Sequence, residues 1–71
     1  MNASILRQLW FSVEQTQATT LLELSDTDLV TRLVQQLGKK HPFSREEETF
    51  WDRYIRSKTP LIRDLAEARL S

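Results

Sequence analysis

Apolar residues recur along this chain at helical spacing, and the pattern predicts an all-α fold. The clearest stripe is Leu29, Leu33 and Leu37, which recur every fourth residue and therefore share one side of a helix. The N-terminal stripe has the same spacing and comprises Ile5, Leu9 and Val13. We expect a bundle of three to four helices over the ranges 3–18, 26–37, 45–57 and 60–70.

Capping residues predict where these helices begin and end. Asn2 is the expected N-cap of the first helix, and Ser25 is the expected N-cap of the second. Ser44 with Glu47 three residues later forms a capping-box sequence at the start of the third. Gly38 fits a left-handed position just beyond the end of the second helix.

Pro60 leaves the last helical segment open to two interpretations. Thr59-Pro60 resembles an N-cap followed by proline at the first helical position, which predicts a separate fourth helix. The apolar stripe also continues in phase through Pro60, which predicts one long, kinked helix. We favour a break or sharp kink near residues 57–59.

Two apolar faces are expected to point inward from this C-terminal segment. The first comprises Phe50, Trp51, Tyr54 and Ile55. The second comprises Leu61, Ile62, Leu65, Ala66 and Leu70. Since one helix cannot bury four large side chains on a narrow seam, some aromatic residues are expected at the edge of the core.

Composition supports a single helical domain over residues 1–71. The chain has one glycine and two prolines, too few for the turns of a small β-protein. Its formal net charge is zero and it has no cysteine, which excludes a disulfide scaffold, a thiol nucleophile and a strongly basic arm. A core this small supplies little stability, so self-association or partner binding is expected on physical grounds.

The sequence favours a cytoplasmic protein. The N-terminus lacks the basic segment and apolar run of a signal peptide, and the uncharged stretches are too short to span a membrane. We therefore expect no association with a membrane.

No combination of residues predicts enzymatic chemistry, a cofactor or a metal. His41 is the single histidine, and no nucleophile or orienting carboxylate is specified beside it. The acidic residues at 46–48 are explained by the positive end of a helix dipole. Gly38 alone cannot form a phosphate-binding loop. We expect a non-enzymatic protein with no catalytic residue.

The leading functional hypothesis is a protein-interaction module. Surplus aromatic and arginine residues are typical of binding hot spots. We expect a small adaptor or regulator that binds a protein partner, or itself as a homo-oligomer, through an apolar or aromatic helix face. The candidate contact residues are Trp10, Phe11, Trp51, Tyr54, Arg53 and Arg56.

The alternative is a nucleic-acid-binding transcriptional regulator of the helix-turn-helix type. Two short helices joined by a tight linker admit this interpretation, although the zero net charge disfavours it. Its candidate residues are Arg53, Arg56, Lys58 and Arg63.

Two runs of residues resemble small helical proteins of cyanobacteria that have no assigned activity. They are Tyr54-Ile55-Arg56-Ser57-Lys58-Thr59-Pro60-Leu61-Ile62-Arg63-Asp64-Leu65-Ala66 and, upstream, Ser25-Asp26-Thr27-Asp28-Leu29-Val30. The resemblance spans most of the chain. It implies a cytoplasmic and regulatory role, and it brings no catalytic or binding residues with it.

Overall fold

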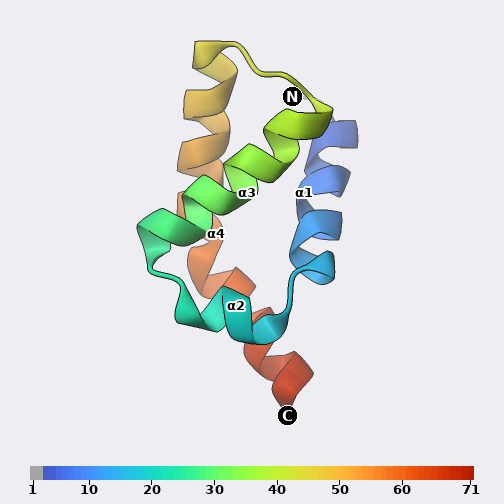
Figure 1. Ribbon diagram of the computed structural model, residues 1–71, viewed down its shortest axis with the longest axis vertical. Coiled ribbons are helices and arrows are strands. Elements are labelled where there is room, and N and C mark those ends of the chain that lie inside the picture. The colour runs from blue at the N-terminus through green and yellow to red at the C-terminus, as the bar shows by residue number, and fades with distance from the viewer. Residues whose placement is uncertain (1–2) are drawn as a thin grey trace.

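Helices account for nearly all of the computed structural model, which describes residues 3–71 (Figure 1). They are α1 at Ala3–Gln15, α2 at Ala18–Glu23, α3 at Asp26–Lys40 and α4 at Arg45–Leu70. No strand occurs in these residues, so the predicted all-α fold is confirmed. The N-cap expected at Asn2 lies outside the described residues.

The helices surround α3, which crosses the molecule diagonally (Figure 1). α3 packs against both α1 and α4, and α2 packs against α4 at the lower end of the molecule. α1 and α3 run in opposite directions, and so do α3 and α4, as short connections dictate. The molecule measures 37 × 21 × 18 Å, and the C-terminal end of α4 marks one end of its long axis.

One hydrophobic core joins all four helices. Its buried residues are Ile5, Leu9, Val13, Leu21, Leu29, Val30, Leu33, Leu37, Trp51, Ile55, Ile62 and Ala66. The stripes predicted for the first two helical segments are all buried there. The inward placement predicted for Phe50, Leu61, Leu65 and Leu70 is wrong, because these four side chains are exposed.

The first helix is shorter than predicted. It ends at Gln15, and a separate six-residue helix follows at Ala18–Glu23. The Thr16 hydroxyl donates a hydrogen bond to the Ser12 carbonyl at 2.8 Å, and Gln17 is extended. The Thr16 amide still donates to the Ser12 carbonyl at 3.1 Å, so the helical backbone is interrupted only at the extended Gln17.

Gly38 does not end α3. The described chain has no glycine with positive φ, and α3 continues through Gly38 to Lys40. Pro42 restricts the residue before it to extended backbone, and His41 has φ −133° and ψ 88°. The proline therefore sets the end of this helix, and Lys39 and Lys40 occupy its last turn.

α4 runs through Pro60 as one helix, so of the two interpretations the single, kinked helix is the one observed. Figure 1 shows the C-terminal half of α4 slanting away from the line of its first half. Pro60 has no amide hydrogen for the Arg56 carbonyl. The buried Thr59 side chain replaces it, because its hydroxyl donates to that carbonyl at 3.1 Å. The helix thus continues at the cost of a bend.

The predicted serine caps are confirmed. Ser25 accepts a hydrogen bond from the Asp28 amide at 3.2 Å. Ser44 accepts one from the Glu47 amide at 3.2 Å, and the Glu47 carboxylate accepts one from the Ser44 amide at 3.1 Å. The bond from the Ser44 amide to the carboxylate, followed by the effect of the Ser44 side chain, lowers the pKa of Glu47 below its ordinary value of 4.5, because both favour the ionised form.

Candidate interaction surface

α4 has two apolar faces, and the rest of the chain covers one of them. The covered face packs against α2 and α3 and comprises Trp51, Ile55, Thr59, Ile62 and Ala66. The second face, which we call the open stripe, comprises Phe50, Tyr54, Ser57, Leu61, Leu65 and Ala68. With about 100° of rotation per residue, the open stripe spans an arc of about 80° and is centred about 120° from the covered face.

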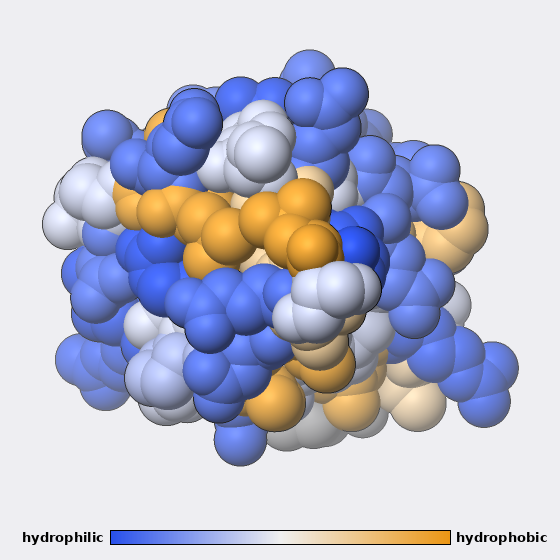
Figure 2. Space-filling model, turned by 90° about the horizontal axis from the view of Figure 1, so that it is seen from below, coloured by the Kyte–Doolittle hydropathy of each residue, from blue (hydrophilic) through white to orange (hydrophobic). Residues whose placement is uncertain are grey.

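Large apolar side chains on the open stripe face solvent. The exposed fractions are 44% for Phe50, 46% for Leu61 and 45% for Leu65, and Tyr54 is half-buried. Figure 2 shows an apolar band between hydrophilic areas at the end of the molecule where α2 and the C-terminal half of α4 lie. Contiguous exposed apolar surface is characteristic of binding sites in small proteins.

Three aromatic rings in mutual contact hold the N-terminal part of the open stripe against the core. Trp51 is 3% exposed and contacts Phe50 and Tyr54 edge-on, with ring centroids 5.2 and 5.5 Å apart. Phe50 and Tyr54 lie nearly parallel to each other, at 6.5 Å. The packing fixes the two outer rings, which reduces the entropy lost when a partner covers them. Trp51 itself is a core residue and offers no face to a partner.

Trp10 extends the open stripe onto α1. Together with Val13, Glu14 and Arg69 it lines a small hollow beside Leu65, of about 200 Å³. The hollow is mainly apolar, and Trp10 is half-buried. The predicted contact residue Trp10 is therefore adjacent to an exposed leucine of α4, which sequence analysis assigned to the core.

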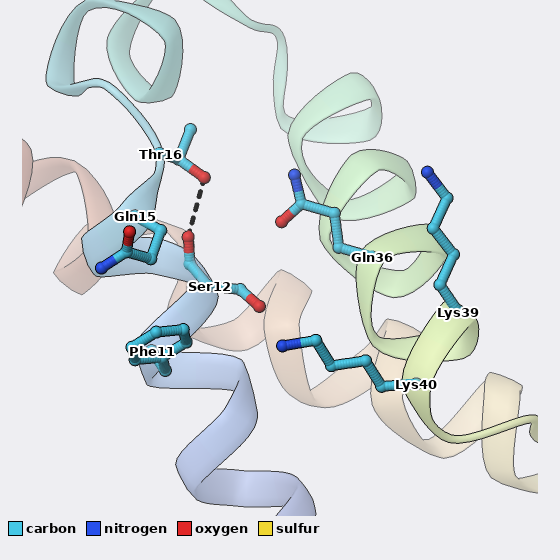
Figure 3. Close-up of a pocket in the computed structure, with 7 residues that line it drawn as sticks. All are labelled: Phe11, Ser12, Gln15, Thr16, Gln36, Lys39 and Lys40. Atoms are coloured by element: carbon cyan, nitrogen blue, oxygen red, sulfur yellow. Dashed lines mark hydrogen bonds between the residues drawn. The ribbon is translucent and has the colours of Figure 1, made fainter.

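Phe11 lies on a different surface, in a groove between α1 and α3 (Figure 3). The groove is about 340 Å³ and is lined by Phe11, Ser12, Gln15, Thr16, Gln36, Lys39 and Lys40. The Lys40 ammonium lies 5.6 Å from the centre of the Phe11 ring and 3.5 Å from the Gln8 side-chain oxygen. The predicted contact residues are thus divided between at least two surfaces.

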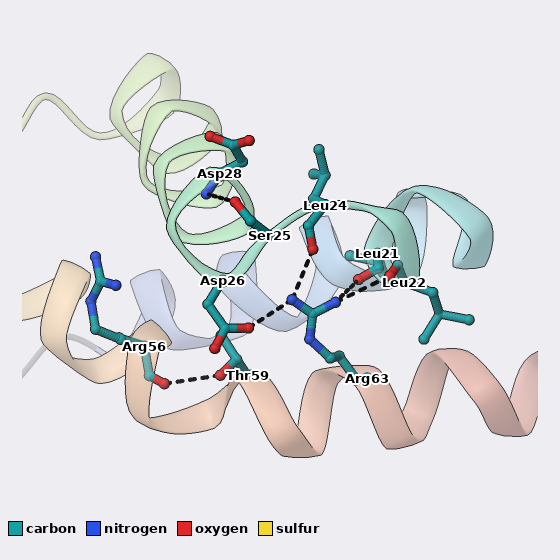
Figure 4. A network of polar contacts seen from close by, with 9 residues as sticks. All are labelled: Leu21, Leu22, Leu24, Ser25, Asp26, Asp28, Arg56, Thr59 and Arg63. Atoms are coloured by element: carbon teal, nitrogen blue, oxygen red, sulfur yellow. Dashed lines mark hydrogen bonds and ion pairs between the residues drawn. The ribbon is translucent and has the colours of Figure 1, made fainter.

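Arg63 is engaged inside the chain, where it joins α4 to the C-terminal end of α2 and to the first residue of α3 (Figure 4). Its guanidinium donates to the carbonyl oxygens of Leu21, Leu22 and Leu24 at 2.9, 3.3 and 2.8 Å. It also pairs with the Asp26 carboxylate at 2.7 Å. The last carbonyls of a helix lack backbone partners, so a cation there satisfies them and opposes the helix dipole.

Arg69 does the same for α1. It donates to the Glu14 and Thr16 carbonyls, both at 3.0 Å. α4 therefore closes the C-terminal ends of α1 and α2 with arginines. Local sequence does not reveal this structural role, because the carbonyls that accept hydrogen bonds from Arg63 and Arg69 are distant in the chain.

Three of the four predicted nucleic-acid residues contact other groups of the same chain. Arg63 has the internal contacts described above, and Arg56 pairs with Asp52 at 3.5 Å. The Lys58 ammonium lies over the Tyr54 ring, 5.7 Å from its centre. Arg53 is exposed and lines a hollow with Phe50 and Tyr54 at the edge of the open stripe. Arg53 therefore lies beside aromatic rings, while the other three cations contact groups of their own chain.

The described residues bring no set of metal-ligating side chains together. No group of three or more His, Cys, Asp or Glu residues is suitably placed for a metal within residues 3–71. His41 is half-buried at the C-cap of α3, where its backbone amide donates to the Leu37 carbonyl at 2.9 Å. None of the helices in this part of the chain combines the length and hydropathy that crossing a bilayer requires.

Comparison with known proteins adds no further assignment. No protein-family model, curated protein or solved structure matches this chain. The resemblance to small cyanobacterial proteins therefore stays an expectation. The surface of α4 is the feature that bears on function.

Proposed function

We propose that this chain is a non-enzymatic protein-interaction module, which binds a protein partner or a second copy of itself through the open stripe of α4. The observation that supports the proposal most directly is the exposure of Phe50, Leu61 and Leu65 along one side of a helix. In this proposal the module acts in the cytoplasm as a small adaptor or regulator.

The position of these residues on a well-held helix adds to the argument. α4 is fixed to the other helices by its covered face and by the bonds from Arg63 and Arg69. A partner that covers the open stripe therefore meets a surface whose backbone is already ordered. Anchoring apolar residues on a rigid element lowers the entropy lost in association.

Arg53 complements the apolar part of this surface. It lies at the edge of the open stripe beside Phe50 and Tyr54. Arginine and tyrosine are both enriched at the residues that dominate binding energy in protein interfaces. Of the predicted contact residues, Trp10, Tyr54 and Arg53 adjoin the open stripe, whereas Trp51 is buried and Phe11 lies in the groove between α1 and α3.

Affinity capture from a nuclease-treated lysate of the protein's own source tests the proposal. Tagged wild-type chain is compared with the variant Leu61→Glu/Leu65→Glu, which adds two charges to the open stripe. We expect recovery of a specific protein, or of the untagged chain itself, to fall at least about tenfold in the variant, because burying an unpaired carboxylate opposes association.

The matched control is Thr31→Glu/Gln35→Glu, which adds the same charges four residues apart on the exposed side of α3. This control should retain wild-type recovery. Equal recovery with both variants, or no specific protein recovered by the wild-type chain, would contradict the proposal. Recovery that disappears on nuclease treatment would favour the nucleic-acid alternative.

A further inference from the structure

We infer that the open stripe binds the open stripe of a second copy of this chain, so that two α4 helices pack antiparallel around a twofold axis near Thr59. The inference rests on the proposed function and names the partner. It follows from the arrangement of large, small and charged side chains along α4.

The spacing of the open stripe suits helix-to-helix packing. Its members follow one another at intervals of four, three, four, four and three residues, close to the alternation that aligns the contact seam of two supercoiled helices. The helix is long enough for several layers, since α4 spans Arg45–Leu70. Two such stripes can therefore cover each other over most of their length.

Large side chains face small ones in two of the three pairs of the antiparallel arrangement, and Tyr54 meets Leu65 in the third. A twofold axis near Thr59 brings Phe50 of one copy opposite Ala68 of the other. The same axis brings Ser57 opposite Leu61. A large residue facing a small one fills the space between two helices without voids, as a close-packed interface requires.

Charge at the edge of the open stripe selects antiparallel over parallel pairing. In an antiparallel pair, Arg53 comes level with residue 65 of the second copy, between its Asp64 and Glu67, and the symmetry repeats this contact. In a parallel pair, Arg53 would lie opposite Lys58 of the second copy, which is a like charge. Flanking charges set the orientation of paired helices in this way.

Lys58 is the one cation near the proposed axis, where it approaches its own symmetry copy. Its ammonium lies 5.7 Å from the centre of the Tyr54 ring in the same chain, which holds it over an aromatic face. The two complementary arginine–glutamate contacts flank the axis on the opposite side of the helix. Repulsion between the two Lys58 ammonium groups offsets part of the attraction in the arginine–glutamate contacts. We therefore expect a dimer of moderate affinity rather than a permanent one.

Charge reversal combined with sedimentation equilibrium tests this inference. The wild-type chain should form dimers as its concentration rises from micromolar to millimolar. Arg53→Glu and Glu67→Arg should each weaken dimerisation by about tenfold, since each places like charges together twice. The double variant should restore it, because the pair is then reversed but still complementary.

Arg32→Glu is the control, since it makes the same charge change at an exposed position of α3, outside the open stripe and its flanks. It should dimerise like the wild-type chain. Circular dichroism of each variant checks that the helices are retained. A wild-type chain that stays monomeric would overturn the inference, and so would a dimer that neither single reversal weakens or that the double reversal fails to restore.

The result also separates this inference from the proposed function. A monomeric chain that still captures another protein through Leu61 and Leu65 would overturn the dimer and leave the interaction module intact. A monomeric chain that captures nothing would overturn both.

Discussion

Arg63 shows how a single side chain can join distant parts of a small protein. Its guanidinium satisfies carbonyls at Leu21, Leu22 and Leu24 and meets the carboxylate of Asp26. The side chain is 25% exposed, so these bonds are only partly screened by water. Three carbonyls at the end of α2 and one carboxylate at the start of α3 thus depend on one residue of α4.

We expect Arg63→Ala to lower the free energy of unfolding by about 1–2 kcal/mol, because it leaves carbonyls at the end of α2 without their donor. Arg56→Ala is the matched control. Its ion pair with Asp52 is about half exposed and should contribute no more than about 0.5 kcal/mol. Urea unfolding followed by circular dichroism measures both. Equal effects of the two substitutions would contradict the structural role of Arg63.

At the scale of an element, the start of α4 depends on the exchange of hydrogen bonds between Ser44 and Glu47. The pKa of Glu47 is lowered from 4.5, chiefly by the bond from the Ser44 backbone and then by the bond involving its side chain. A carboxyl whose pKa is lower in the folded chain stabilises the fold above the unfolded pKa. That contribution is lost as the pH falls below 4.5 through the folded pKa.

Glu47→Gln should therefore flatten the dependence of stability on pH below about 4.5, since glutamine accepts the same bond without titrating. Unfolding curves in urea at pH 7 and at about pH 3 give the comparison. Glu46→Gln, in the same exposed turn but without a bond to Ser44, should follow the wild-type profile more closely. Identical profiles for the two variants would show that the capping box has no such role.

Element boundaries illustrate what local sequence can and cannot predict. Ser25 and Ser44 cap helices as expected, because a cap depends on residues three positions away. At Gly38 and Pro60 the helix continues although the motif predicts its end. A nearby residue changes the outcome in each case. Pro42 stops α3 after Gly38, and the Thr59 hydroxyl replaces the bond that Pro60 removes.

At the scale of the whole molecule, helical periodicity predicts the all-α fold but not which side of α4 is covered. Ile62 and Leu65 both fit an apolar stripe, yet the chain buries the first and exposes the second. The choice depends on where α2 and α3 meet α4, which requires the tertiary structure. The position of Arg63 is a similar case, since its acceptors lie about 40 residues earlier in the chain.

The same geometry explains why the candidate surface differs from the predicted set. Aromatic content alone suggested Trp51, which is the ring most deeply buried in the core. Leu61 and Leu65 were assigned to the core by their spacing from Ile62 and Ala66. Their rotation of about 100° from those neighbours is the signal that places them on a second face.

Nuclear magnetic resonance of the unmodified chain, labelled with nitrogen-15, tests most directly whether the open stripe is a contact surface. Amide spectra are compared for dilute protein, for concentrated protein and for labelled protein in an unlabelled lysate of its own source. We expect shifts or broadening at Phe50, Tyr54, Leu61 and Leu65, with the exposed side of α3 around Gln35 unchanged. Spectra that stay the same throughout, or changes confined to the groove at Phe11, would contradict the account.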